Sequence, residues 1–139
     1  MIRVFCVSAK RAICDGIASV LNTAHDLAWV GSSGPRKAST RCAELKPDIV
    51  LLSLSAPDPD NLRAARTIIS KHLRTRVVVL SQSDEPEHAH TMLRIGVSGY
   101  LLYASDLADL PISIRAVHSG TVVYSQAIAH MLIQSIPRS

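Results

Sequence analysis

Runs of apolar residues alternate along the chain with segments in which apolar side chains recur every three or four positions. The short apolar runs are typical of strands that are buried on both faces of a sheet. The intervening segments have helical spacing, as in residues 10–23. We therefore expect strands over the following runs: Ile2–Val7, 27–31, Ile49–Leu54, 77–80 and 99–103.

Turn and cap residues mark the ends of the helices expected between these strands. Pro35 suits the first turn of a helix that runs to about Leu45. Asp58 or Asp60 can cap a helix over residues 62–72. Acidic residues open the next helix, at the end that favours negative charge, and Gly96 closes it.

Pro111 sets the start of the helix that follows the fifth strand. Within a helix, proline removes a hydrogen bond and clashes with the preceding turn. We therefore expect residues 106–110 to form a loop or distorted turn, and the regular helix to begin at or near Pro111 and run to about Ser119. Asp109 or Leu110 would cap it. Five strands alternating with five helices predict an α/β fold with a parallel sheet covered on both faces.

Composition agrees with one compact domain. The chain has 139 residues, of which 47% are hydrophobic and 19% charged. No apolar run approaches the roughly 20 residues that span a bilayer, so we expect a cytoplasmic protein with no membrane contact. The net charge of +4 includes a loose basic group, for which a solvated helix face is as good an explanation as nucleic-acid binding. The group comprises Arg63, Arg66, Lys71, Arg74 and Arg76.

No metal ion or other cofactor is expected from the residue pattern. Cys6, Cys14 and Cys42 cannot all pair and match no zinc or redox spacing, which favours buried apolar roles. His88 and His90 lie two apart on a helix and point away from each other. A glycine- and serine-containing segment at residues 31–34 resembles an anion cradle but fits a plain turn better.

Four strings in order resemble the receiver domain of NarL/FixJ-type response regulators over nearly the whole chain. They are Ile2-Arg3-Val4, Lys46-Pro47-Asp48-Ile49-Val50-Leu51-Leu52, Gly96-Val97-Ser98-Gly99-Tyr100-Leu101-Leu102, and Ile114-Arg115-Ala116-Val117 followed by Gly120-Thr121-Val122-Val123. The resemblance implies a three-layer (βα)5 receiver fold of flavodoxin-like type, with a five-stranded parallel sheet in the order 2-1-3-4-5. It also divides the chain into a receiver at residues 1–120 and a linker with a short terminal helix at 121–139.

The same resemblance implies that the phosphorylation pocket is degenerate. Ser8 and Ala9 stand where the family has its Mg²⁺-binding acid pair, and Ser53 stands in place of the acceptor aspartate. Ser81 keeps the hydroxyl position, whereas Tyr103 replaces the lysine, three residues after the switch-type aromatic Tyr100. Without carboxylates or a lysine, little remains to bind Mg²⁺ or to neutralise a transferring phosphoryl group.

We therefore expect a regulatory domain and not an enzyme. Its control would work through homodimerisation or a small molecule in the vacated pocket, unless Lys10, Arg11 or Tyr103 fills that space. Hydrophobic residues of the fourth helix, fifth strand and fifth helix, or of the last helix, would supply the dimer surface. DNA would be bound only through a C-terminal domain that this chain does not contain. A free-standing receiver-like module for protein–protein interaction is the alternative.

Overall fold

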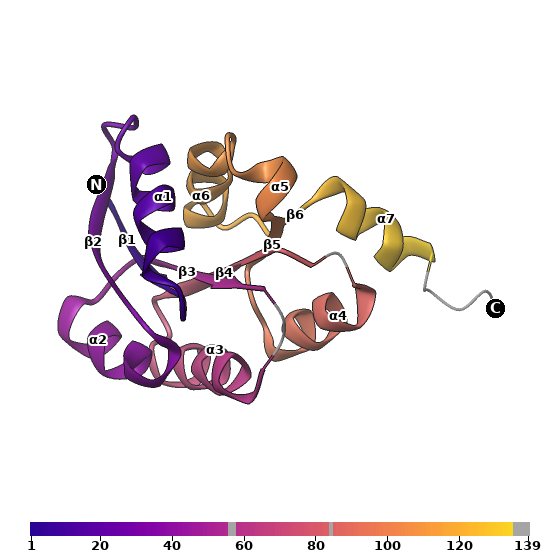
Figure 1. Cartoon of the computed structure of the whole chain (residues 1–139), viewed down its shortest axis with the longest axis horizontal. Helices are drawn as coiled ribbons and strands as arrows, with labels where there is room; N and C mark the ends of the chain where they lie inside the picture. Colours follow the sequence, from indigo (N-terminus) through magenta and orange to yellow (C-terminus); the bar gives the residue numbers. More distant parts are fainter. Residues whose placement is uncertain (56–57, 84, 135–139) are drawn as a thin grey trace.

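The computed structural model describes residues 1–55, 58–83 and 85–134. Its centre is a parallel sheet of six strands in the order β2-β1-β3-β4-β5-β6. Helices cover both faces in three layers (Figure 1). One face carries α1 (Arg11–Leu21) and α6 (Leu110–His118), and the other carries α2 (Ala38–Leu45), α3 (Pro59–Lys71) and α4 (Pro86–Ile95). The strands are β1 (Ile2–Val7), β2 (Leu27–Ser33), β3 (Ile49–Leu54), β4 (Arg76–Ser81), β5 (Gly99–Leu102) and β6 (Val123–Tyr124).

The expected flavodoxin-like order of the first five strands is confirmed, but the expected total of five is wrong. The sixth strand, β6, pairs in parallel with β5. Val123 N–H donates to the Ser98 carbonyl (3.1 Å), and Ser125 N–H donates to the Tyr100 carbonyl (2.8 Å). Two residues are too few to show the alternation that identifies a strand, so this pairing with β5 left no pattern in the sequence.

The helices connect these strands in chain order. They are α1 (Arg11–Leu21), the 3₁₀ turn η1 (Pro35–Lys37), α2 (Ala38–Leu45), α3 (Pro59–Lys71), α4 (Pro86–Ile95), α5 (Tyr103–Asp106), α6 (Leu110–His118) and α7 (Gln126–Gln134). Asp58 is the N-cap of α3 and accepts a hydrogen bond from Asn61 N–H at 2.8 Å. Gly96 ends α4 with φ +109°, a conformation that glycine adopts without strain.

Side chains of the central strands fill two separate clusters, one on each face of the sheet. Along β3, Val50, Leu52 and Leu54 pack with residues of α2, α3 and α4. Ile49 and Leu51 of the same strand pack with residues of α1 and α6 on the opposite face. This arrangement confirms that the continuous apolar runs are strands buried on both faces.

The chain around Pro111 follows the sequence prediction closely. The helix α6 begins at Leu110, so Pro111 lies in its first turn, where a backbone N–H has no helical partner. Asp109 is at the N-cap position but makes no side-chain cap hydrogen bond. The expected loop over residues 106–110 is shorter, because Asp106 still belongs to α5 and its carboxylate accepts a bond from Leu102 N–H at 2.8 Å.

The turn expected at residues 31–34 is wrong, because β2 continues through Ser33. A bulge in β2 faces Val4 and Phe5 of β1, and Gly31 at this point has φ +147°. The glycine allows the strand to absorb the extra residue and to resume pairing as far as Ser33. This extension places Ser32 and Ser33 beside the end of β1.

The last described helix, α7, packs back onto the body of the domain against α4 (Figure 1). Ile128 is fully buried in the cluster on the α2–α3–α4 face, and Met131 and Leu132 pack partly against it. Ile136, which was expected to continue this apolar stripe, lies outside the described residues. The boundary predicted at residue 120 stays a prediction. Within the described ranges, no helix has the length and apolar character needed to cross a membrane.

We predict that α7 contributes to stability through Ile128. Ile128→Ala should lower the free energy of unfolding by about 2–4 kcal/mol, because it removes fully buried methyl groups and leaves a cavity. Ile133→Ala is the matched control on the same helix, where the side chain is 68% exposed, and should change the value by less than about 0.5 kcal/mol. Urea denaturation followed by circular dichroism measures both, and equal effects would contradict the docking of α7.

Candidate functional site

The strands' carboxyl ends bring the predicted site positions to one edge of the sheet. Ser8 directly follows β1, Ser53 is the second-last residue of β3, and Ser81 is the last residue of β4. Tyr103 follows β5 and begins α5, so the strand expected to include it ends one residue earlier. In the register of the sheet, Ser53 lies opposite Leu80 and Ser81 lies opposite Leu102.

Ser53 is buried at this edge without a partner for its hydroxyl. Its side chain is 3% exposed, and Oγ has no hydrogen-bond partner among the described residues. Alternation along β3 puts Ser53 on the same face as Leu51, towards α1 and α6. A buried hydroxyl without a hydrogen bond carries a desolvation cost of about 1–3 kcal/mol.

The hydroxyl of Ser81 is, by contrast, fully used within its own turn. It donates to the Ser83 carbonyl at 2.8 Å and accepts from Ser83 N–H at 3.0 Å. These two bonds satisfy both backbone groups of Ser83 as the chain leaves β4. The structure therefore assigns Ser81 a local role in holding the loop after β4.

Ser8 begins the turn that leads from β1 into α1. Its N–H donates to the Ser33 carbonyl at 3.0 Å, and its hydroxyl accepts from Lys10 N–H at 3.1 Å. Ala9, Lys10 and Arg11 are all exposed. Of the side chains that the sequence suggested could fill the pocket, Arg11 lies in the lining of a hollow beside Ser8.

The two tyrosines at this edge lie on different faces of the sheet. Tyr103 packs partly against the α1–α6 cluster, with its hydroxyl close to Gly16 of α1. Tyr100 is fully buried on the other face, and its hydroxyl has no hydrogen-bond partner among the described residues. Burial raises the pKa of Tyr100, and the nearby Ser81 hydroxyl opposes part of that rise.

A hollow of about 350 Å³ opens beside Ser8, at the ends of β1 and β2. The sequence predicted two of its lining residues, Ser8 and Ala9, as site positions. It considered Arg11 only as a side chain that could fill the pocket, and residues 31–34 only as an anion cradle less favoured than a turn, and it did not connect Cys14 with the site. The carboxyl ends of neighbouring parallel strands lie at the same edge of a sheet, so strand order could have placed the β2 residues beside Ser8. This signal was lost because the strand was expected to end at residue 31. The hollow is lined by Ser8, Ala9, Arg11, Cys14, Ser32, Ser33 and Gly34.

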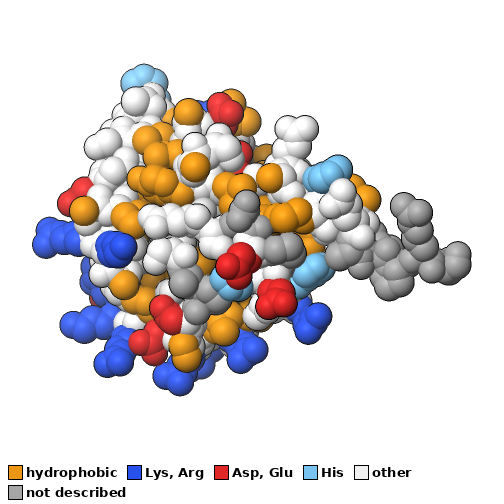
Figure 2. All heavy atoms as spheres, turned by 45° about the vertical axis from the view of Figure 1, so that its right-hand side comes forward, with side chains coloured by type: hydrophobic (Ala, Val, Ile, Leu, Met, Phe, Trp, Pro, Cys, Tyr) orange, Lys and Arg blue, Asp and Glu red, His pale blue; other side chains and the backbone are white. Residues whose placement is uncertain are grey.

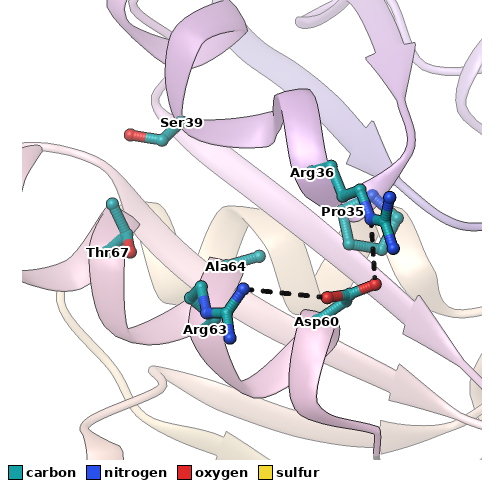
Figure 3. Close-up of a pocket in the computed structure, with 7 residues that line it drawn as sticks. All are labelled: Pro35, Arg36, Ser39, Asp60, Arg63, Ala64 and Thr67. Atoms are coloured by element: carbon teal, nitrogen blue, oxygen red, sulfur yellow. Dashed lines mark hydrogen bonds and ion pairs between the residues drawn. The ribbon is translucent and has the colours of Figure 1, made fainter.

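A second hollow, of about 450 Å³, lies between α3 and the segment that precedes α2 (Figure 3). Asp60 sits between two arginines there, 3.3 Å from Arg36 and 4.0 Å from Arg63. The arginine side chains are 87% and 77% exposed, so these pairs contribute little to stability. Because Asp60 offsets part of the positive charge, this hollow is a weaker anion site than its two arginines suggest.

On the face seen in Figure 2, basic side chains gather over one region of the molecule. Figure 2 shows Lys and Arg (blue) gathered along the lower part of the view, where α2 and α3 lie in Figure 1. Arg63, Arg66 and Lys71 are exposed on α3, as expected of a solvated helix face. Arg76 differs from that expectation, because it is the first residue of β4 and donates a hydrogen bond to the Val117 carbonyl at 2.6 Å.

No protein-family model matches the chain. It is similar to the response regulator GacA of Pseudomonas viridiflava, with 32% identity over 133 residues that cover 95% of this chain and 62% of GacA. It is also similar to the nitrate/nitrite response regulator NarL of Escherichia coli K12, with 31% identity over 122 residues, 87% of this chain and 56% of NarL. The chain thus spans about three fifths of the length of these relatives.

Solved structures agree with this similarity. A LuxR-family two-component response regulator from Aurantimonas sp. SI85-9A1 has a TM-score of 0.87 and 25% identity, with 95% of each chain covered. The structure of two RcsB dimers bound to two parallel DNAs has a TM-score of 0.83 and 20% identity, over 99% of this chain and 70% of that chain. At that identity, the second comparison shows a shared fold alone.

We predict that the two buried serines respond differently to loss of their hydroxyls. Ser53→Ala should raise the free energy of unfolding by up to about 1–3 kcal/mol, because it removes a buried hydroxyl that has no described partner. Ser81→Ala, at a similarly buried position, should cost about 1–3 kcal/mol, because both Ser83 backbone groups lose their partner. Chemical denaturation measures the two variants, and equal losses would show that Ser53 has a partner of comparable strength.

Proposed function

Because this chain is a receiver domain of the NarL/LuxR family of response regulators, we propose that it is a pseudo-receiver. In this proposal it regulates transcription through an attached DNA-binding domain without accepting a phosphoryl group. The observation that carries the proposal is Ser53, a buried neutral hydroxyl in β3 at the position where the family resemblance calls for an acceptor carboxylate. A phosphoryl acceptor must be reachable by its donor, whereas Ser53 is 3% exposed.

The other pocket positions support the same proposal. Magnesium binds through carboxylates and phosphate oxygens, and Ser8, Ala9 and Ser53 supply no anionic group. Phosphoryl transfer also needs positive charge near the equatorial oxygens, and Tyr103 is neutral and packs towards α1. The Ser81 hydroxyl is already engaged with Ser83. Nothing in this set of side chains would hold the metal or stabilise the transferring group.

DNA binding would belong to a further domain of the whole protein. The chain spans about three fifths of GacA and NarL, so these relatives have room for such a domain. The RcsB dimers of the solved complex bind DNA, and paired DNA-binding domains read paired half-sites. In this proposal the whole protein is cytoplasmic. A free-standing interaction module is the alternative, and the full gene sequence distinguishes the two.

In a receiver that is not phosphorylated, two other means of control are available. A homodimer is the first, and the exposed Ile112 on α6 is a candidate contact because it is 64% exposed. Other apolar residues of the helices that the sequence suggested for a dimer surface are covered within the domain. Met92 and Ile114 are buried, and α7 packs against α4. A small polar molecule in the hollow beside Ser8 is the second, since ligands of open α/β sheets bind at the strands' carboxyl ends.

We predict that the domain does not become phosphorylated by acetyl phosphate with Mg²⁺ present. Intact-mass spectrometry should show an unchanged mass, because the acid positions hold Ser8, Ala9 and Ser53. A variant with Ser8→Asp, Ala9→Asp and Ser53→Asp is the control that restores the carboxylates and should regain Mg²⁺ binding. A gain of one phosphoryl group in the unaltered chain that disappears in Ser53→Ala would overturn the proposal.

We further predict a homodimer with α6 in its interface. Light scattering behind a sizing column should give about twice the chain mass of 15.0 kDa. Ile112→Glu should shift the mass to that of one chain, because a carboxylate would be desolvated in the contact. Ile133→Glu on α7 is the matched exposed control and should leave the dimer intact. A single-chain mass for the unaltered protein at tens of micromolar would leave ligand binding as the means of control.

A further inference from the structure

Two of the three cysteines meet in the fold although they lie on different elements. Cys6 is in β1 and Cys14 is in the first turns of α1. Their sulfur atoms are 3.1 Å apart, and both thiols are free. A disulfide requires about 2 Å between sulfurs, so a shift of about 1 Å would bring the two atoms to bonding distance.

The pair lies against the hollow beside Ser8, although both cysteines are almost fully buried, with Cys14 1% exposed and Cys6 0% exposed. Cys14 lines this hollow, together with Ser32 and Ser33 from β2. Cys6 lies behind it in the strand and is fully buried. A small oxidant entering the hollow would therefore reach the Cys14 sulfur first, with Cys6 directly behind it.

The surroundings of the two thiols shift their pKa values in opposite directions. The contact with Cys6 and a bond from Ser32 lower the pKa of Cys14, against the effect of burial and of Asp15. The same sulfur contact, with burial, raises the pKa of Cys6. The thiolate is the reactive form of cysteine, and Cys14 is the sulfur that lines the hollow, so Cys14 is the first to react and Cys6 acts in the second step.

We propose that Cys6 and Cys14 are a redox modification site that forms a reversible intramolecular disulfide with hydrogen peroxide. This site does not depend on the pseudo-receiver proposal, because none of the residues compared with the phosphorylation pocket takes part in the chemistry. Disulfides in reducing compartments are mostly transient ones with catalytic or sensing roles, and two free thiols in contact fit that use.

The reaction balances in two steps. The Cys14 thiolate attacks one peroxide oxygen, the O–O bond breaks, and the departing hydroxide takes a proton to become water, which leaves Cys14 as a sulfenic acid. The Cys6 sulfur then attacks the Cys14 sulfur, the S–O bond breaks and the S–S bond forms. The proton of Cys6 leaves with the released hydroxide as a second water. Both sulfurs are oxidised, and the peroxide is reduced to two waters.

The third cysteine provides an internal control. Cys42 is in α2 on the opposite face of the sheet, and burial alone raises its pKa to about 11. It has neither a thiol neighbour among the described residues nor a place in the lining of the hollow beside Ser8. Cys42 should therefore stay reduced under conditions that oxidise the pair.

The experiment treats the folded chain with hydrogen peroxide and then alkylates the remaining thiols after denaturation. The expected product is a single chain that has lost two hydrogen atoms and carries one alkyl group, on Cys42. Trypsin cuts after Arg3, Lys10, Arg11, Arg36 and Arg41, so each cysteine falls in a different peptide. The digest should contain one cross-linked species, residues 4–10 joined to 12–36, which dithiothreitol separates.

Matched alanine variants test the roles of the two sulfurs. Cys42→Ala should form the same disulfide, whereas Cys6→Ala, which also loses the contact that lowers the pKa of Cys14, should react more slowly and stop at a sulfenic acid on Cys14 that dimedone traps. Cys14→Ala should give neither product. If a variant fails to fold, the peptide map of the unaltered chain decides alone. Three alkylated cysteines after peroxide treatment, a bond to Cys42, or a bond between chains would overturn the proposal.

Discussion

The central strands carry apolar side chains on both faces, and this constraint governs the rest of the structure. Val50 and Leu52 of β3 point to one face and Ile49 and Leu51 to the other. Burying each such side chain stabilises the fold by roughly 1.5–3 kcal/mol, so both faces of the sheet must be covered by helices. Parallel strands with crossover helices satisfy that need. Their common direction also brings Ser8, Ser53 and Ser81 to one edge.

Elements that form because of their own residues could be predicted, whereas elements that form through pairing with distant residues could not. Ile2–Val7 and Ile49–Leu54 were predicted to the residue, because their own apolar runs are what the core requires. The start of α6 followed from Pro111 alone. The strand β6 was missed, because two residues become a strand only through pairing with β5. The length of β2 was underestimated because a bulge at Gly31 lets the strand continue past a glycine.

In the candidate site, the positions of the residues could be predicted from the sequence, whereas their hydrogen bonds and contacts could not. The sequence predicted which residues lie at the strands' carboxyl ends, because strand order and direction decide that. It could not predict that the Ser81 hydroxyl bonds to Ser83, whereas that of Ser53 has no described partner, because loop geometry decides those bonds. The contact between Cys6 and Cys14 could not be predicted from the sequence either. Eight positions separate the two residues, and only the packing of α1 on β1 brings them together.

Neutral side chains at the carboxyl edge of the sheet can be buried at a lower cost than carboxylates. A carboxylate at Ser53, where the side chain is 3% exposed, would need a metal ion, a cationic partner or water. A hydroxyl at the same place costs far less to bury. In the proposed pseudo-receiver, Ser8, Ala9 and Ser53 stand in place of acids, so the ion site is absent. A hydrated opening above β3 is then no longer needed. Regulation of such a domain must then act through contacts that neutral groups make. The proposed packing at α6 would supply one of them, and the proposed redox pair, which joins β1 to α1 directly beside the hollow at Ser8, would supply another.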